Sequence, residues 1–299
     1  MKPKNSKEKW SRIILHVDMN SYFATVEQQC NPFLRGQPIA IGGSPGTRSI
    51  VVAASIEAKR FGVKTGMTPI EAKQCCPQIM FIQGDPAKYG ELTQIFINLA
   101  RGYTSRIDVY SIDELFMDLT GHVRSLQDAC VIATKLKRQL RELVGDYLSC
   151  SVGIAPNRML AKLSSNMKKP DGLVVLRQED IPFVLKWIDL TDIPGIGERL
   201  KRRFFDLGIT NLEQLGKCPL AILLQEFGPN YGLTLSEMGR GIDRTEVQYI
   251  DEVQPAKSIG HTYTLPQNTK DHDEIFSQIV IVLTHHVLVS RCCSSVVLF

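Results

Sequence analysis

Three carboxylates are the residues of this chain best suited to chemistry. Asp18 follows the apolar run Ile13–Val17, and Asp113 and Glu114 are adjacent between two later apolar runs. Carboxylate oxygens suit Mg²⁺, which keeps water and substrate phosphates as its remaining ligands. Two such ions about 4 Å apart activate an attacking hydroxyl and stabilise the leaving oxygen of a phosphoryl transfer. The types and positions of these acids therefore predict a two-metal site, while a solvated turn is the alternative interpretation of the adjacent pair alone.

The elements expected around these acids form a β-α-β-β-α-β pattern once an insert after the first strand is set aside. Hydrophobic periodicity predicts, in order, a strand over 13–17, a helix over 89–103, two strands within 106–119, a helix over 125–144 and a strand over 149–155. This order is typical of a ferredoxin-like domain, in which the two strands that carry the acids are neighbours in one sheet. The pattern thus brings acids that are distant in sequence to one edge of the sheet.

The bulk properties fit a protein with more than one domain. At 299 residues the chain exceeds the size at which a single core usually stops growing. Its net charge of +4 permits a nucleic-acid partner without requiring one. Its 8 cysteines show no CxxC spacing, which favours free thiols. The polar N-terminus, and the histidines in the apolar stretch 279–299, favour a cytoplasmic protein without a signal peptide or membrane anchor.

A glycine-rich turn in the wholly helical stretch 175–243 suggests a DNA contact. Gly195 and Gly197 lie in the sequence Pro-Gly-Ile-Gly, and Arg199 and Lys201 follow directly. Glycines let a backbone approach a phosphate, and the N-terminus of the next helix offers free N–H groups. The pattern resembles a helix-hairpin-helix that grips duplex DNA without reading its sequence. A plain helical turn with a solvated basic face is the alternative.

Several segments, in order and at the right spacing, resemble motifs of the Y-family of DNA polymerases, most closely its bacterial branch. The stretch His16–Glu27 (HVDMNSYFATVE) is similar to the first motif, and Tyr110–Asp118 (YSIDELFMD) is similar to the second. Residues 52–63 resemble the fingers segment, and residues 151–157 and 162–172 resemble later palm segments. The resemblance implies template-directed DNA synthesis across damaged DNA, with primer-template DNA and deoxynucleoside triphosphates as partners. It leaves open whether a sliding clamp binds.

The resemblance also implies roles for individual residues. Asp18, Asp113 and Glu114 would be catalytic and would hold two Mg²⁺ ions, with the backbone carbonyl of Met19 as a further ligand. Phe23 falls at the steric-gate position, where an aromatic ring excludes a 2′-hydroxyl. On spacing alone, the same phenylalanine is better interpreted as a core residue of an amphipathic helix.

The residues at the expected nucleotide-binding positions differ in part from the family's pattern. Lys169 matches the lysine that neutralises the incoming triphosphate, and Lys59 stands where an arginine usually has the same task. Ile56 replaces a tyrosine and Ala53 a possible hydroxyl, so hydrogen bonds worth about 0.5–1.5 kcal/mol each are lost. Asn20 replaces a common aspartate that is not one of the metal carboxylates. These changes favour weaker triphosphate binding.

We expect an α+β protein with a ferredoxin-like palm, a small fingers insert, a helical helix-hairpin-helix thumb and a partial α/β little finger. The expected boundaries are palm 1–20 and 86–174, fingers 21–85, thumb 175–243, linker 244–256 and partial little finger 257–299. The last segment offers a strand over 258–265 and a helix over 273–290, which is marginal for an independent sheet domain. We therefore expect a truncated or frameshifted little finger that binds DNA weakly.

Two other functions remain compatible with these residues. A catalytically weak or inactive DNA-binding accessory factor of the same fold is favoured by Ile56 and the short C-terminal segment, and is disfavoured by the intact acids. A nucleotide cyclase also uses a ferredoxin-like palm with paired acids. The helical segment and glycine turn after residue 175 favour the polymerase.

Overall fold

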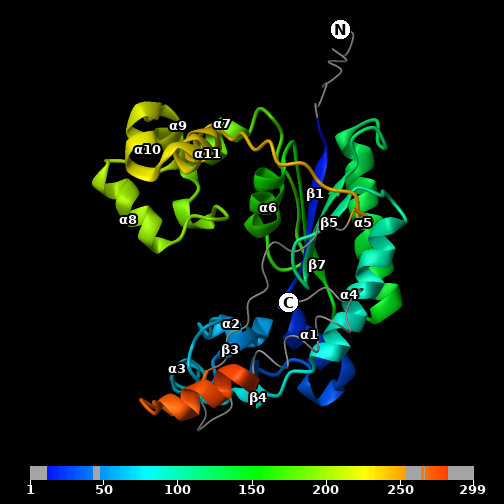
Figure 1. Cartoon of the computed structure of the whole chain (residues 1–299). Coiled ribbons are helices and arrows are strands. Elements are labelled where there is room, and N and C mark those ends of the chain that lie inside the picture. The colour runs from blue at the N-terminus through cyan, green and yellow to red at the C-terminus, as the bar shows by residue number, and fades with distance from the viewer. Residues whose placement is uncertain (1–11, 43–47, 253–263, 266, 282–299) are drawn as a thin grey trace. The chain divides into compact units, whose positions relative to one another are not determined.

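The structure is a computed structural model that describes residues 12–42, 48–252, 264–265 and 267–281 (Figure 1). The chain divides into two compact units. One comprises residues 1–22 and 87–251, and the other comprises residues 23–86 and 252–299. In the described part of the chain, no helix is long and apolar enough to cross a bilayer.

A five-stranded sheet with the order β5-β6-β1-β7-β8 forms the centre of the first unit. Its strands are β1 (Ile14–Met19), β5 (Ile107–Val109), β6 (Glu114–Asp118), β7 (Cys150–Ala155) and β8 (Leu173–Val175). β1 pairs antiparallel with both β6 and β7, and β5 pairs antiparallel with β6. These four strands have the ferredoxin-like order, so the predicted fold class is confirmed. β8 adds a fifth strand, parallel to β7, that the sequence analysis does not predict.

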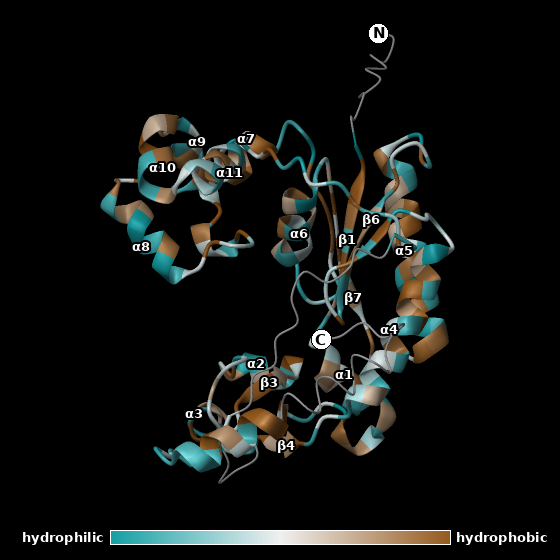
Figure 2. Cartoon of the chain, in the orientation of Figure 1, coloured by the Kyte–Doolittle hydropathy of each residue, from teal (hydrophilic) through white to brown (hydrophobic). Residues whose placement is uncertain are grey.

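Helices cover both faces of this sheet (Figure 1). α4 (Pro86–Arg101) and α5 (Leu126–Val144) lie on one face, and α6 (Arg158–Met167) lies on the other. Every residue of β7 is buried, and so is every residue of β1 except Asp18. Strands that are covered on both sides are expected to be apolar throughout, and β1 accordingly appears hydrophobic along most of its length in Figure 2.

α6 can approach the sheet closely because β7 carries a glycine at position 153. A Cβ atom there would lie 2.1 Å from the carbonyl oxygen of Ala161, so a larger residue would push the helix away. Gly153 is also the register partner of His16 in the β1–β7 pair. The close approach brings Lys162 and Ser165, which are three residues apart on α6, to the side chains of β1 and β6.

The remainder of the first unit is helical. Its elements are α7 (Ile181–Trp187), the 3₁₀ helix η2 (Leu190–Asp192), α8 (Glu198–Asp206), α9 (Leu212–Lys217), α10 (Leu220–Phe227) and α11 (Pro229–Gly239). Buried leucine and isoleucine side chains from these helices pack around Phe204, which is fully buried. The predicted helical stretch from 175 begins later than expected, because Val175 is the last residue of β8.

The second unit contains a three-stranded sheet with the order β3-β2-β4. Its elements are α1 (Tyr22–Cys30), the 3₁₀ helix η1 (Pro32–Leu34), β2 (Ile39–Gly42), β3 (Val51–Ala54), α2 (Ile56–Arg60), α3 (Pro69–Cys75) and β4 (Met80–Ile82). Thr68 and Glu71 form a reciprocal capping box at the start of α3.

Most of the predicted C-terminal elements lie outside the described residues. Residues 272–281 are helical, as expected for the first part of the predicted helix 273–290. The predicted strand 258–265 falls almost entirely on residues that the structure does not describe, and so does the segment after 281.

Candidate active site

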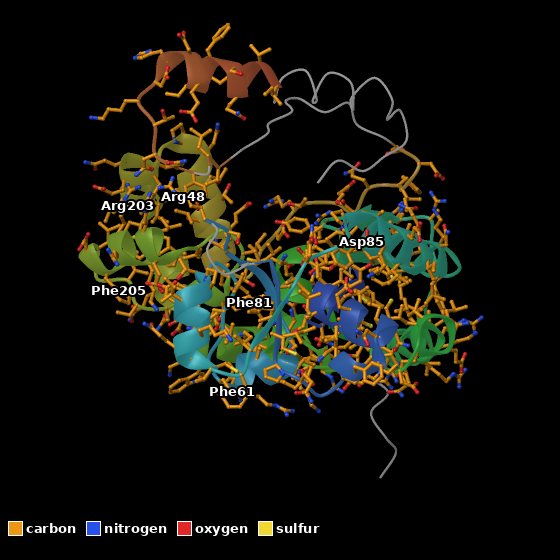
Figure 3. The ribbon with its side chains drawn as sticks, turned by 90° about the horizontal axis from the view of Figure 1, so that it is seen from below. Arg48, Phe61, Phe81, Asp85, Arg203 and Phe205 are labelled. Carbon is orange, nitrogen blue, oxygen red and sulfur yellow. The ribbon has the colours of Figure 1, made fainter. Side chains whose placement is uncertain are left out.

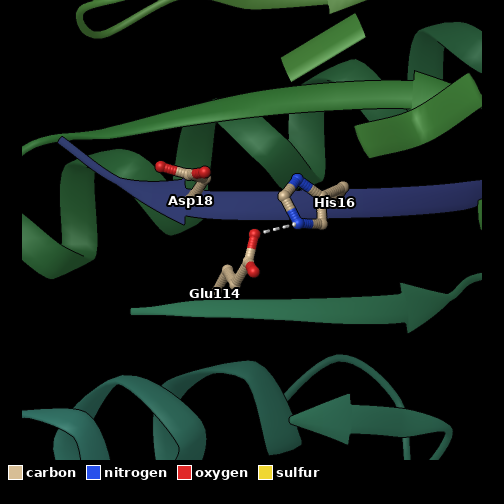
Figure 4. Close-up of side chains that lie close together, drawn as sticks. All are labelled: His16, Asp18 and Glu114. Carbon is tan, nitrogen blue, oxygen red and sulfur yellow. Dashed lines mark hydrogen bonds and ion pairs between the residues drawn. The ribbon is translucent and has the colours of Figure 1, made fainter. Parts of the chain in front are cut away.

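Asp18 and Glu114 face each other across the β1–β6 pair (Figure 4). They are register partners in this antiparallel pair, with Asp18 inside β1 and Glu114 as the first residue of β6. His16 lies two residues before Asp18 and therefore on the same face of the strand. Nitrogen and oxygen atoms from these three side chains all lie within 4.8 Å of one another. The register of the sheet thus builds a compact acidic site.

His16 supports the carboxylate of Glu114 from within the core. Its Nε2 atom lies 3.0 Å from Glu114 Oε2, and its Nδ1 atom lies 2.8 Å from the hydroxyl of Ser165. A carboxylate can only accept, so Nε2 carries the proton. Burial lowers the pKa of His16 despite the opposite effect of Glu114, so the ring is neutral at pH 7. With both nitrogens engaged, His16 orients Glu114 instead of binding a metal ion itself.

Two lysine ammonium groups lie where cations would bind the acids. Lys162 Nζ lies 2.7 Å from both carboxylate oxygens of Glu114, and Lys169 Nζ lies 2.8 Å from Asp18 Oδ2. Burial opposes the charge on Glu114, but hydrogen bonds from His16 and Lys162 lower its pKa to about 2. Asp18 and Glu114 therefore each bind a lysine cation in this structure. Their carboxylate oxygens are donors that fit a hard divalent metal ion.

Asp113 lies beside this pair, in the bend between β5 and β6. Its backbone carbonyl accepts the N–H of Met19 at 2.9 Å, and its carboxylate accepts a hydrogen bond from Ser111. Burial raises the pKa of Asp113 against the effect of Ser111, and the charges of Asp18 and Glu114 raise it further. Its carboxylate is not part of the 4.8 Å group. Asp18 and Glu114 are therefore close enough to affect the pKa of Asp113, and they are the two acids that belong to the 4.8 Å group.

The segment that carries Lys169 is held by α5. Lys137 Nζ lies 3.1 Å from the Asp171 carboxylate and donates to the carbonyl of Gly172 at 3.2 Å. Arg141 also pairs with Asp171. Lys169, which is 37% exposed, lies in this anchored segment and pairs with Asp18 at the edge of the site.

Acid should weaken the contribution of Glu114 to stability. Because its pKa is lowered from 4.5 to about 2, this contribution is present above about pH 4.5 and is lost as the pH falls towards 2. The amide of Glu114→Gln does not titrate. The stability difference between wild type and variant should therefore shrink by roughly 1–3 kcal/mol over that range. Urea unfolding at several pH values in chelating buffer measures it, and a difference that stays constant with pH would contradict the expectation.

The predicted nucleotide-binding residues Phe23 and Lys59 lie in the second unit. Phe23 is half-buried in α1 and packs against a small cluster formed by Ala24, Ile39 and Ile41. Lys59 is exposed in the last turn of α2, a helix that Ser55 caps. The ring of Phe23 thus has a partly apolar setting, which its spacing alone also predicted.

The predicted DNA-binding turn begins α8. Gly195 has a φ of +90°, which favours glycine, and exposed Gly197 is the N-cap residue of the helix. Arg199 is exposed. Lys201 Nζ, in contrast, lies 2.7 Å from the carboxylate of Asp189. The turn and Arg199 are therefore available to a ligand, whereas Lys201 has an internal partner.

α8 is the most polar helix of the thumb region in Figure 2. Arg203 and Phe205, both labelled in Figure 3, also lie on this helix. Arg203 donates to the backbone carbonyl of Glu226 and lies over the ring of Phe227, 4.4 Å from its centre. This arginine helps to hold α8 against α10.

Sequence patterns alone did not indicate a role for His16, Lys162 or Ser165. Alternation along a strand could have indicated His16, because residues two apart point to the same face. Lys162 and Ser165 are three residues apart, which places them on one side of a helix. Only the packing of α6 on the sheet shows that this side faces the acids.

Comparisons with known proteins agree with this architecture. The model of the impB/mucB/samB family matches residues 17–166, and a model described as the DNA polymerase-iota thumb domain matches residues 191–243. The DNA polymerase IV of Pelotomaculum thermopropionicum is 39% identical over 263 residues, which are 88% of this chain and 64% of that protein. The DNA polymerase IV of Moorella thermoacetica is 38% identical over 281 residues, which are 93% of this chain and 68% of that protein.

A solved structure described as an insertion ternary complex of Dbh DNA polymerase is also similar. Its TM-score is 0.71 with 32% sequence identity, and the match covers 77% of this chain and 67% of that chain. A ferredoxin-like palm with paired acids, followed by a helical thumb, is the architecture that this chain shares with these polymerases. The chain belongs to the Y-family of DNA polymerases, the family that the impB/mucB/samB model describes. It is a homologue of DNA polymerase IV, and its family uses divalent metal ions in translesion DNA synthesis.

Proposed function

We propose that this chain is a DNA-directed DNA polymerase that adds deoxynucleotides to a primer 3′ end, with low fidelity, across damaged template. The observation that carries the proposal is the register pairing of Asp18 with Glu114, each with a lysine ammonium on its carboxylate. Such a site is arranged to hold positive charge at one place on the palm sheet. Positioning and charge stabilisation supply most of the catalysis in this type of phosphoryl transfer.

The acids and a backbone carbonyl would hold the metal ions. Asp18, Asp113 and Glu114, with the carbonyl of Met19, offer oxygen donors of the kind that Mg²⁺ prefers. Two bound Mg²⁺ ions would lower the pKa of the primer 3′-hydroxyl and neutralise charge on the transferring phosphate. The raised pKa of Asp113 adds support, because a partly buried carboxylate near two other acids is stabilised by added positive charge.

Other residues would bind and select the nucleotide. Lys169 would turn from Asp18 to the triphosphate, where a mobile ammonium group suits phosphate oxygens. Lys59 would add positive charge from α2. Phe23 would pack under the sugar and exclude a 2′-hydroxyl. Ile56 begins α2 without a hydroxyl group, which would leave the triphosphate with fewer hydrogen bonds.

The thumb would bind the phosphate backbone of the DNA duplex. Gly195 and Gly197 would let phosphates approach the N-terminus of α8, and Arg199 and Lys201 would add charge. Such contacts do not read sequence, as a polymerase that must accept any template requires. Primer-template DNA and deoxynucleoside triphosphates are the proposed partners, and the bacterial cytoplasm is the proposed location.

Primer extension with purified protein tests the proposal. With Mg²⁺ and all four deoxynucleotides, we expect extension on an undamaged template and insertion opposite an abasic site. Absence of extension at high enzyme and nucleotide concentrations would overturn it. If the protein then still bound primer-template DNA, the accessory-factor alternative, which Ile56 favours, would take its place.

Freeing Lys201 should strengthen DNA binding. Asp189 is fixed by Lys201 and by Thr191, and these hydrogen bonds lower its pKa to about 2. In Asp189→Asn the lysine loses its charged partner and can bind a phosphate. We expect roughly 2- to 5-fold tighter binding at low salt, and a salt dependence of log K that is steeper by about 1. Fluorescence anisotropy over a range of salt concentrations measures both quantities.

The matched control for this prediction is Glu179→Gln. Glu179 forms an exposed ion pair with Arg177, 3.5 Å apart, so its loss changes the net charge equally without freeing a thumb lysine. If Asp189→Asn and this control had the same salt dependence, Lys201 would not be a phosphate contact.

A further inference from the structure

Thr93, a buried residue of α4, holds the bend that carries Asp113. Its side chain is within the core, at 4% exposure, and its Oγ1 lies 2.6 Å from the carbonyl oxygen of Ile112. A threonine inside a helix usually donates back to the carbonyl four residues earlier, and Tyr89 O is indeed 2.9 Å away. The hydroxyl has a single proton, so it cannot donate to both carbonyls at once.

Tyr22 contacts both Thr93 and the carbonyl that competes for this proton. Its hydroxyl lies 2.8 Å from Tyr89 O and 3.0 Å from Thr93 Oγ1. Burial raises the pKa of Tyr22 to about 12, so its hydroxyl keeps its proton and donates. When Tyr22 donates to Tyr89 O, that carbonyl is satisfied and the proton of Thr93 is left for Ile112.

The carbonyl of Ile112 belongs to the peptide that leads directly into Asp113. On the other side of this residue, the carbonyl of Asp113 accepts the N–H of Met19 at 2.9 Å. Other backbone bonds at the bend are internal to the hairpin: Tyr110 N and Ser111 N both donate to the carbonyl of Glu114. Thr93 therefore supplies a hydrogen bond from outside the hairpin, one peptide away from the proposed metal ligand.

We propose that Thr93 is a positioning residue for Asp113, and that Tyr22 directs the Thr93 hydroxyl onto the carbonyl of Ile112. This inference rests on the proposed polymerase function. Thr93 touches neither substrate nor metal in it. It holds the backbone of the 110–113 bend, and so fixes the position from which the carboxylate of Asp113 would reach a metal ion held by Asp18 and Glu114. Partners that orient a ligand in this way typically change metal affinity or activity by about 10- to 100-fold.

Three variants test this role. Thr93→Val keeps the shape of the side chain and removes the hydroxyl, and Thr93→Ser keeps the hydroxyl. Thr134→Val is the matched control, because Thr134 donates to the carbonyl of Cys130 at 2.8 Å within α5 and is exposed. Manganese affinity of the full chain, measured by electron paramagnetic resonance without DNA or nucleotide, is the first readout. kcat and KM for primer extension are the second.

We expect Thr93→Val to bind Mn²⁺ roughly 10-fold more weakly and to lose a similar factor in kcat, with KM for DNA unchanged. Thr93→Ser should recover both values to within about threefold, and Thr134→Val should match wild type. A valine variant equal to wild type would overturn the inference, and so would equal losses in the valine and serine variants.

If Thr93→Val does not fold, Tyr22→Phe tests the same relay, because Tyr89 O then competes for the Thr93 proton. A several-fold loss of Mn²⁺ affinity is then expected, and wild-type affinity would overturn the inference.

These readouts separate this inference from the polymerase proposal. If wild type extends no primer, the proposed function fails, yet the Mn²⁺ affinities of the variants still report on the positioning of Asp113. If wild type extends primers and Thr93→Val behaves identically, only the role of Thr93 fails.

Discussion

Asp113→Asn is expected to lower kcat for primer extension by at least about 100-fold, because a neutral amide binds the stabilising Mg²⁺ ions more weakly than the carboxylate would. Asparagine has nearly the same shape as aspartate, and its carbonyl oxygen can still accept the hydrogen bond from Ser111. The backbone bond between Asp113 and Met19 is unaffected by the change. The loss should therefore appear in kcat under single-turnover conditions with Mg²⁺, while the Kd for primer-template DNA stays near that of wild type.

The control for this variant is Asp146→Asn, which makes the same chemical change in an exposed turn of the same unit. It should leave kcat within about twofold of wild type, as surface substitutions usually do. If Asp113→Asn retained more than a tenth of wild-type kcat, Asp113 would not be a catalytic carboxylate. The two-metal site would then have to rest on Asp18 and Glu114 alone.

Phe23→Ala is expected to raise incorporation of ribonucleotides relative to deoxynucleotides by roughly 5- to 150-fold. The basis is steric, because the 2′-hydroxyl of a ribonucleotide would clash with the packed ring of Phe23. Overpacking of this kind raises the free energy by about 1–3 kcal/mol. The ring of Phe23 is held by its cluster with Ala24, Ile39 and Ile41, so it cannot easily move aside. Single-nucleotide insertion with paired ribo- and deoxynucleotides gives the ratio of kcat/KM values that measures sugar selectivity.

Phe33→Ala is the matched control in the same unit. Phe33 lies in the 3₁₀ helix η1 and is 91% exposed, so its removal leaves the packing of Phe23 intact. Sugar selectivity should be unchanged in this control. If Phe23→Ala also left selectivity unchanged while it still extended primers, another residue would act as the gate.

Elements with strong local signals could be predicted well from the sequence. The helix from Pro69 to Cys75 begins directly after its capping residue Thr68, a signal that the sequence carries locally. The helix expected over 125–144 likewise begins directly after the N-cap residue Ser125. In both cases the signal is contained in a few neighbouring residues. The ferredoxin-like order could also be predicted, because it follows from the succession of elements alone.

Predictions of where a strand begins or ends were less accurate where those ends depend on pairing with other strands. The first strand was expected to stop at Val17, before Asp18, but β1 continues to Met19. Hydrogen-bonded partners on both sides, β6 and β7, extend it through residues of low strand propensity. Glu114 was expected in the bend and instead begins β6.

The three acids and the order of elements that makes their strands neighbours could both be predicted from the sequence. These properties are local, or follow from the periodicity of single elements. The surroundings of the acids depend on tertiary packing. His16 and Lys162 contact Glu114, Lys169 contacts Asp18, and Thr93 contacts the carbonyl of Ile112 beside Asp113. Those contacts join segments that are distant in the chain. They exist because strand register and the packing of α4 and α6 on the sheet set distances of a few ångströms that local spacing does not encode.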